Sequence, residues 1–226
     1  MIFAFCAILA GVFTFGKQVV LCVSPFFLTG VRIGIGGLCF FVYQFLMNRK
    51  SLTIKKSYFW LLVAHVFFTF FTDFLRLYSL KCIPASYGAM IGTMAPFIAA
   101  FLSWWWFNEK FGTRKAVALI IGVSGVMPLF LSHATVSVGD WQETVWCYIA
   151  AVIATFCQVM CGILGRAIQN KGCHLLTLIS FVMVGCGMIA MSASLVFESW
   201  HPIPVTDYWT AFPLLAFLIV THSLIA

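Results

Sequence analysis

Residues 92–111 read GTMAPFIAAFLSWWWFNEKF, and the environment that tolerates this stretch decides the fold class. The stretch belongs to a segment from Cys82 to Asn108 that contains no charged residue, and Pro96 lies near its middle. Such a long, continuous apolar run is typical of a helix that crosses a membrane. The strands of a membrane barrel show instead short segments in which apolar and polar residues alternate. In hydrocarbon a proline is tolerated where neighbouring helices, polar side chains or cavity water satisfy the carbonyl group that it frees, here that of Gly92.

The composition of the whole chain leads to the same conclusion. Of its 226 residues, 63% are hydrophobic and only 8% are charged, and the mean hydropathy is +1.06. Soluble domains carry about 25% charged residues, so this chain could not cover a surface that faces water. We therefore predict an all-α fold, a polytopic helical membrane protein. The predicted spans, each near the ~20 residues that cross a bilayer core of about 30 Å, are 1–22, 26–47, 58–79, 84–107, 113–132, 144–166, 174–197 and 207–226.

The positive charges indicate how these spans are oriented. The formal net charge is +7, and most basic residues fall in or beside loops on one side of the predicted topology. The opposite loops hold Lys81 together with acidic residues, namely Asp140, Glu143, Glu198 and Asp207. The positive-inside rule then predicts a cytoplasmic N-terminus, and the charges need no nucleic-acid partner. The clustered basic residues are Arg49, Lys50, Lys55, Lys56, Lys110, Arg114, Lys115, Arg166 and Lys171.

Two stretches resemble a known family. Residues 84–129, PASYGAMIGTMAPFIAAFLSWWWFNEKFGTRKAVALIIGVSGVMPL, resemble the conserved core of the EamA type of the drug/metabolite transporter superfamily. Residues 24–37, SPFFLTGVRIGIGG, resemble the second helix of that family, with Pro25 and Arg32 in place. The resemblance covers about residues 1–131. The small residues, the mid-helix proline, the glutamate at the helix end and the Gly-rich helix that carry it are Gly88, Pro96, Glu109, Gly122 and Gly125.

The resemblance implies ten helices built as two inverted five-helix repeats, an architecture that recurs in transporters. Residues 1–131 would form the first repeat, with five transmembrane helices. Residues 132–226 would form the second repeat, which is incomplete, with three transmembrane helices. Residues 217–226, FLIVTHSLIA, are still apolar, and we expect the chain to be a fragment of a longer transporter.

Ionisable residues within the spans are the candidate substrate-binding residues. Each costs at least about 2.5–3.5 kcal/mol near the bilayer centre, so it needs a partner or a cavity. Asp73 and Arg76 lie three residues apart on one helix and can pair, whereas Lys17 can also extend toward the interface. The candidates thus include three cations, Lys17, Arg32 and Arg76, but a single carboxylate, that of Asp73. An anionic group on a substrate would restore neutrality. Tyr78 is a further candidate, because a buried hydroxyl group needs a polar partner.

Two more residues are candidates for a helix bend or a gate. Pro96 is either a packing kink or a bend that lines a cavity. Glu109 lies at a predicted helix C-terminus, where negative charge is unfavourable; it forms a local ion pair, caps the following helix or takes part in gating. We predict no metal site and no cofactor, because the nearest cysteine pair, Cys157 and Cys161, has no His or acidic companions.

These observations favour a secondary transporter that moves a small zwitterionic or anionic metabolite by alternating access across a bacterial cytoplasmic membrane. The resemblance implies an amino acid or an amino-acid-bearing compound such as S-adenosylmethionine, which some relatives in the superfamily carry. One alternative is a proton-coupled exporter of cationic or aromatic compounds, with Asp73 as the proton site. Another is a truncated, non-transporting membrane partner, completed by a homodimer or by the missing helices. We do not expect an enzyme, because hydrolase and phosphate-loop motifs do not occur in the sequence. The expected partners are a small-molecule substrate and the lipid bilayer, with no nucleic acid.

Overall fold

The computed structural model describes residues 14–20, 23–47, 56–107 and 141–198, with positions 112–113, 117, 120–121, 124 and 216. This described part of the chain is helical and contains no strand. A short helical segment covers residues 14–20. The other elements are α2 (Pro25–Met47), the 3-10 turn η2 (Lys56–Tyr58), α3 (Phe59–Cys82), α4 (Ala85–Gly92), α5 (Ala95–Phe107), α7 (Trp141–Asn170) and α8 (Leu175–Phe197).

The long helices confirm the predicted polytopic helical membrane fold. Five segments are long and apolar enough to cross a membrane, and each overlaps a predicted span: Pro25–Met47, Lys56–Cys82, Ala85–Leu102, Val145–Asn170 and Leu175–Phe197. The predicted spans 113–132 and 207–226, and most of 1–22, lie outside the residues whose structure is described. The division into two repeats therefore stays a prediction.

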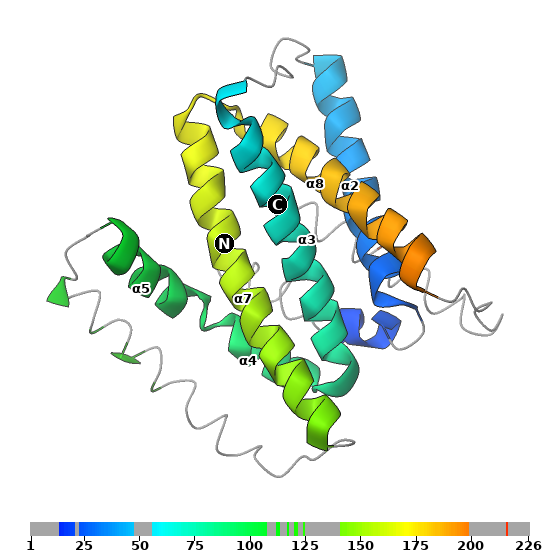
Figure 1. Ribbon diagram of the computed structural model, residues 1–226, viewed down its shortest axis with the longest axis vertical. Helices are drawn as coiled ribbons and strands as arrows, with labels where there is room; N and C mark the ends of the chain where they lie inside the picture. Colours follow the sequence, from blue (N-terminus) through cyan, green and yellow to red (C-terminus); the bar gives the residue numbers. More distant parts are fainter. Residues whose placement is uncertain are drawn as a thin grey trace.

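Two pairs of helices form the bundle (Figure 1). α2 packs along α8, and α3 packs along α7, although the members of each pair are far apart in the sequence. α3 also contacts α8, which joins the two pairs, and α4 and α5 lie against α7.

Glycine residues let the backbones of α2 and α8 approach closely. A Cβ atom added to Gly187 would lie 2.6 Å from the Cα atom of Gly34, and one added to Gly37 would lie 2.7 Å from the backbone nitrogen of Val184. Small residues at such crossings are characteristic of membrane helices, where association relies on close packing because lipid is as apolar as the side chains. The α2–α8 pair is therefore held by direct contact between backbones.

A buried polar contact also joins α2 and α8. Gln44 Nε2 donates a hydrogen bond of 2.5 Å to Thr177 Oγ1, and Ser180 Oγ lies 3.2 Å from Gln44 Oε1. A polar group that is buried without a partner is costly, so the side-chain amide of Gln44 requires α8 at this position.

The fourth predicted span is interrupted before its proline. α4 ends at Gly92, Thr93 and Met94 form a turn, and α5 begins at Ala95. Pro96 therefore lies in the first turn of α5, where its missing N–H group has no intrahelical partner to lose. This corrects the prediction of a continuous helix in which Pro96 frees the carbonyl group of Gly92: the chain changes direction two residues earlier, and Met94 N donates to Ile91 O at 3.0 Å within the turn.

One end of the bundle is rich in basic residues. Lys171, in the turn between α7 and α8, donates from Nζ to the carbonyl oxygen of Ser57 at 3.2 Å. The α7–α8 turn and η2 therefore lie together, and Lys56 and Arg166 lie at or within about a turn of them. We call this the basic end. The opposite end holds the C-terminus of α3, the N-terminus of α2 and the C-terminus of α8 (Figure 1).

Candidate functional site

A cavity of about 560 Å³ lies between α3, α7 and α8, and Arg32 of α2 also lines it. Residues of α3 at positions 65, 69, 72, 73 and 76 form one wall, because this spacing puts them on a single helix face. Polar residues of α7 continue that wall toward the basic end. The α7 residues are Gln158, Cys161, Gly162, Gly165, Arg166 and Gln169, and the α8 residues, which form an apolar wall, are Leu175, Leu178, Ile179, Val182 and Met183.

An ion pair closes the inner part of the cavity. Arg32 Nη2 of α2 lies 2.6 Å from Asp73 Oδ1 of α3, and the two side chains expose only 4% and 7% of their surface. The sequence predicted that Asp73 could pair with Arg76 on its own helix, whereas the ion pair in the structure joins two helices. Arg32 reaches Asp73 because α2 and α3 bring the two side chains together, a contact between helices that spacing along α3 does not reveal.

Arg76 lies beside this pair and contacts a third helix. Its Nη2 atom donates a hydrogen bond of 2.5 Å to Gln158 Oε1 of α7. Arg76 is also coupled electrostatically to both Asp73 and Arg32. Two guanidinium groups thus share one carboxylate, and the amide oxygen of Gln158 adds a neutral acceptor. Counted among the described residues alone, Arg32, Arg76 and Asp73 together carry two positive charges and one negative charge.

Two polar atoms at the cavity are buried without a hydrogen-bond partner among the described residues. They are Arg32 Nε and His65 Nδ1. His65 packs against α7 at Gly165, where an added Cβ atom would lie 3.2 Å from the imidazole ring. Buried polar groups are normally satisfied, so these two atoms are exceptions within the described part of the chain.

Comparison with known proteins identifies the family. Residues 1–131 match the profile of the EamA-like transporter family. The chain belongs to this family. The helices that carry the match include α2, α3, α4 and α5, and among their residues Arg32, Asp73 and Arg76 line the cavity.

Curated relatives of this EamA chain occur in Chlamydia. Proteins of Chlamydia trachomatis serovars L2 and D, each named as an S-adenosylmethionine/S-adenosylhomocysteine transporter, are 24% identical over 217 residues, which is 94% of this chain and 66% of theirs. A Chlamydia muridarum protein with the same name is 24% identical over 86% of this chain and 62% of its own length. The EamA chain thus spans slightly less than two thirds of these relatives.

A solved crystal structure has the same fold. It aligns with 96% of the EamA chain and 78% of its own chain, with a TM-score of 0.64 and 17% sequence identity. At this identity the likeness supports the helical arrangement alone.

Three of the other residues predicted for the site of the EamA chain, Lys17, Tyr78 and Pro96, do not line the cavity. Lys17 Nζ donates a hydrogen bond of 2.8 Å to Ile83 O, just beyond α3, where a cation suits the negative end of the helix. Tyr78 is exposed, and its ring lies 6.1 Å from that of Phe74. Pro96 is exposed and does not line the cavity. Glu109 lies outside the described residues, and gating by either residue stays a prediction.

Sequence reasoning missed several residues that line the cavity. Thr69, Thr72 and Gln169 were not singled out, and Arg166 was counted only among the basic residues in or beside loops, yet all four line the cavity. The signal that could have found the threonines was their spacing with Asp73 on one face of α3.

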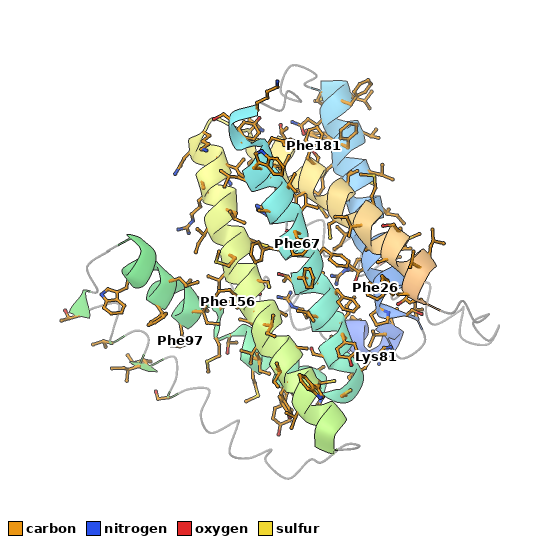
Figure 2. All side chains as sticks on the ribbon, in the orientation of Figure 1. Phe26, Phe67, Lys81, Phe97, Phe156 and Phe181 are labelled. Atoms are coloured by element: carbon orange, nitrogen blue, oxygen red, sulfur yellow. The ribbon has the colours of Figure 1, made fainter. Side chains whose placement is uncertain are left out.

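Aromatic rings pack together between α2, α3 and α8. The ring of Phe26 of α2 stacks on that of Phe74 of α3, with centroids 4.0 Å apart and an angle of 7° between the planes. Phe70 of α3 stacks on the Phe26 ring with centroids 6.2 Å apart, and the ring of Phe197 of α8 lies 6.3 Å from that of Phe26. Phe26 is labelled in Figure 2. This stack brings α2, α3 and α8 together on the side of the Arg32–Asp73 pair that faces away from the basic end.

The carboxylate of Glu198 links the end of α8 to the N-terminus of α2. Glu198, directly after α8, accepts hydrogen bonds from the backbone N–H groups of Phe26 at 2.9 Å and Phe27 at 3.1 Å, and from Ser194 Oγ at 2.7 Å. The two N–H groups belong to the first turn of α2, which has no intrahelical acceptors for them. The sequence could not predict this cap, because cap and helix are separated by more than 170 residues.

Glu198→Ala should lower the free energy of unfolding by about 0.5–2 kcal/mol, the usual effect of losing an N-cap. Glu198→Gln should cost less, because it keeps an acceptor oxygen but loses the charge that favours a helix N-terminus. Thermal melting of the purified variants in detergent measures both. Equal melting temperatures for Glu198→Ala and the parent would show that the cap contributes nothing.

Proposed function

We propose that this EamA chain forms the substrate-binding part of a transporter for a small carboxylate-bearing metabolite, either zwitterionic or anionic. The excess of guanidinium over carboxylate groups inside the cavity is the observation that supports it. Among the described residues that line the cavity, Arg32, Arg76 and Arg166 bear guanidinium groups and Asp73 bears a carboxylate, which Arg32 contacts at 2.6 Å. A substrate carboxylate would balance this charge at a depth where unbalanced charge is costly.

The size of the cavity fits a metabolite of nucleoside or amino-acid dimensions. Its volume of about 560 Å³ lies within the roughly 300–1,000 Å³ that is usual for small-molecule sites. The names of the chlamydial relatives specify S-adenosylmethionine and S-adenosylhomocysteine. Both compounds bear a carboxylate that suits Arg76, and an adenosyl group that the apolar wall of α8 could cover. We therefore propose an adenosyl amino acid as the substrate.

The arrangement of the helices suggests how alternating access would operate. The cavity extends to exposed residues at the basic end, such as Gln169 and Leu175, and the Phe26 stack and Glu198 join α2, α3 and α8 toward the opposite end. Transport would require these closing contacts to separate while the basic end closes, as in other transporters that rock one helical unit against another. The alternative, a cation exporter that uses Asp73, would need a substrate cation to displace Arg32 from a 2.6 Å contact.

Arg76→Gln should weaken binding of S-adenosylhomocysteine by about 1.5–3 kcal/mol, roughly 10- to 150-fold, because a charge-assisted contact is lost. Arg76→Lys should retain part of the affinity. Lys81→Gln is the matched control, since it removes one positive charge from an exposed position on the same helix outside the cavity. Binding to the full chain in lipid nanodiscs measures the effect. An Arg76→Gln variant that binds as the parent does would refute a carboxylate-binding role.

We further propose that the basic end faces the cytoplasm. The contact between Lys171 and Ser57 brings two of the basic loops together, as the positive-inside rule expects. Cysteines placed at positions 51 and 113 in a cysteine-free background should react with a membrane-impermeant maleimide only after the membrane is opened. A cysteine at position 139 should react in intact cells. Labelling in the reverse pattern would invert this topology.

A further inference from the structure

His65 of α3 is a polar residue of the cavity that the proposed function has not yet used. It lines the cavity in the part of α3 that is close to the basic end. Its ring packs against α7 because Gly165 has no side chain there: an added Cβ atom would lie 3.2 Å from Cε1 and 3.8 Å from Nδ1 of His65. The same Cβ atom would lie 3.8 Å from Cδ2 of Leu178 of α8. The imidazole ring therefore lies where α3, α7 and α8 meet.

The two nitrogen atoms of this ring are in different surroundings. Nδ1 lies on the edge of the ring that faces Gly165 and is buried, so a ligand cannot reach it. Nε2 is not enclosed in this way, and no described residue forms a hydrogen bond with it. Because His65 is only half-buried and lines the cavity, Nε2 is the nitrogen that a ligand can contact.

The burial of Nδ1 also determines which nitrogen carries the proton. A neutral imidazole ring has one N–H donor and one acceptor nitrogen. A proton on Nδ1 would create a buried N–H group with no acceptor among the described residues, and such groups are rarer in folded proteins than unsatisfied carbonyl acceptors. A second proton would create the same buried N–H group and add a charge. His65 therefore presents an uncharged N–H donor, at Nε2, to the cavity.

His65 lies at a definite distance from the residue to which the proposed function assigns the substrate carboxylate. His65 and Arg76 line the cavity from one face of α3, about three turns or roughly 16 Å apart along the helix axis. An extended adenosyl amino acid can span this distance. Thr69 contacts Cys161 at 3.5 Å, so the neighbouring Gly162 of α7 lies at a level between the two ends. A Cβ atom added to Gly162, which lines the cavity, would meet no atom within 4 Å, so the space between the ends is open.

We propose, on the basis of the function proposed above, that His65 recognises the base of the substrate. Its Nε2–H group donates a hydrogen bond to a ring nitrogen of the adenine, while the carboxylate lies near Arg76. The ring nitrogens N1, N3 and N7 of adenine are acceptors and suit an uncharged donor. A ligand with a CH group at the contacted position would leave the Nε2–H group unpaired, which is unfavourable once the ligand has displaced water. His65 is thus a residue that determines specificity for the base.

Calorimetric titration of the full chain in nanodiscs tests this proposal with S-adenosylhomocysteine and three deaza analogues. In the analogues a CH group replaces N1, N3 or N7 of the adenine, so each keeps the shape of the base and loses one acceptor. One analogue should bind the parent protein roughly 2- to 10-fold more weakly than S-adenosylhomocysteine, the effect of losing a hydrogen bond between neutral groups. If all three analogues bind the parent as S-adenosylhomocysteine does, no ring nitrogen is recognised and the proposal is overturned.

Two polar variants of His65 assign the effect to this residue. His65→Gln places an amide N–H donor at about the reach of Nε2 and should keep the weaker binding of that analogue. His65→Asn is shorter, so its amide cannot reach the same atom, and S-adenosylhomocysteine and the analogue should bind it equally.

Other polar residues line the same part of the cavity, among them Arg166 and Gln169. If the analogue bound His65→Asn as much more weakly than S-adenosylhomocysteine as it binds the parent, one of these residues would recognise the base, and the role of His65 would be overturned. Both contrary results leave the proposed function standing, because the parent still binds S-adenosylhomocysteine. If the parent did not bind S-adenosylhomocysteine, the proposed function would fall and the role of His65 with it.

Discussion

Asp73→Leu is expected to lower the stability of the folded chain by about 3–5 kcal/mol, the effect of leaving one member of a buried ion pair uncompensated. Without this carboxylate, Arg32 and Arg76 would face each other inside the bundle, and each already affects the other electrostatically. Arg32→Met should cost less, because Asp73 keeps its coupling to Arg76. The larger loss of stability expected for Asp73→Leu than for Arg32→Met follows from the contact of Asp73 with Arg32 of α2, and the spacing of residues along α3 does not predict it.

The double variant Arg32→Met, Asp73→Leu separates charge from packing. Buried ion pairs can often be replaced by apolar side chains of similar volume at little cost, so the double variant should be more stable than Asp73→Leu alone. Fluorescence-detected size-exclusion chromatography after heating gives the melting temperature of each variant. If the two single effects simply add in the double variant, the side chains do not stabilise each other and the assigned ion pair is wrong.

Gly187→Ala is expected to destabilise the protein by about 1–3 kcal/mol, as overpacking of a tight contact does. The new Cβ atom would lie 2.6 Å from the Cα atom and 2.9 Å from the nitrogen atom of Gly34, and backbone atoms cannot rotate out of the way as a side chain can. α2 and α8 would have to separate. Any separation would also weaken the Gln44–Thr177 contact within the same pair.

Gly34→Ala is the control on the same crossing. Its Cβ atom would lie 3.8 Å from the Cα atom of Gly187, an ordinary van der Waals distance, so this variant should melt close to the parent. Reactivity of the buried Cys186 with a thiol-sensitive dye during heating reports the opening of the α2–α8 pair. If Gly34→Ala and Gly187→Ala lowered the melting temperature equally, the difference between their Cβ distances would not determine stability, which would contradict this prediction.

The sequence predicted the helices better than it predicted their contacts. The apolar runs around 26–47, 58–79 and 174–197 correspond to α2, α3 and α8, because hydrocarbon requires every backbone group to be bonded within its own helix. The fourth run was also found, but its interruption at Thr93 and Met94 was not. A proline indicates that a helix is disturbed nearby, while the packing around it decides at which residue the helix ends.

The sequence singled out charged residues that the structure places around one cavity, but it did not predict their contacts. Arg32, Asp73 and Arg76 were singled out because a charge within a span needs a reason, and all three line the cavity. Lys17 was singled out by the same rule, yet it lies at the end of α3 and bonds a backbone carbonyl group. The rule that a charge within a membrane span needs a partner does not tell whether that partner is a substrate or the carbonyl group at a helix end.

What the sequence alone determined is the membrane environment, the helical fold and the shortage of carboxylates among the buried charges, since each depends on composition and on runs of neighbouring residues. What only the tertiary structure decided is which groups meet. Arg32 bonds Asp73, Arg76 bonds Gln158, and Glu198 caps α2, at sequence separations of 41, 82 and about 170 residues. Helical periodicity relates residues within one or two turns of each other. Contacts between helices depend on how the helices cross, and here the glycines of α2 and α8 set that crossing by letting two backbones touch.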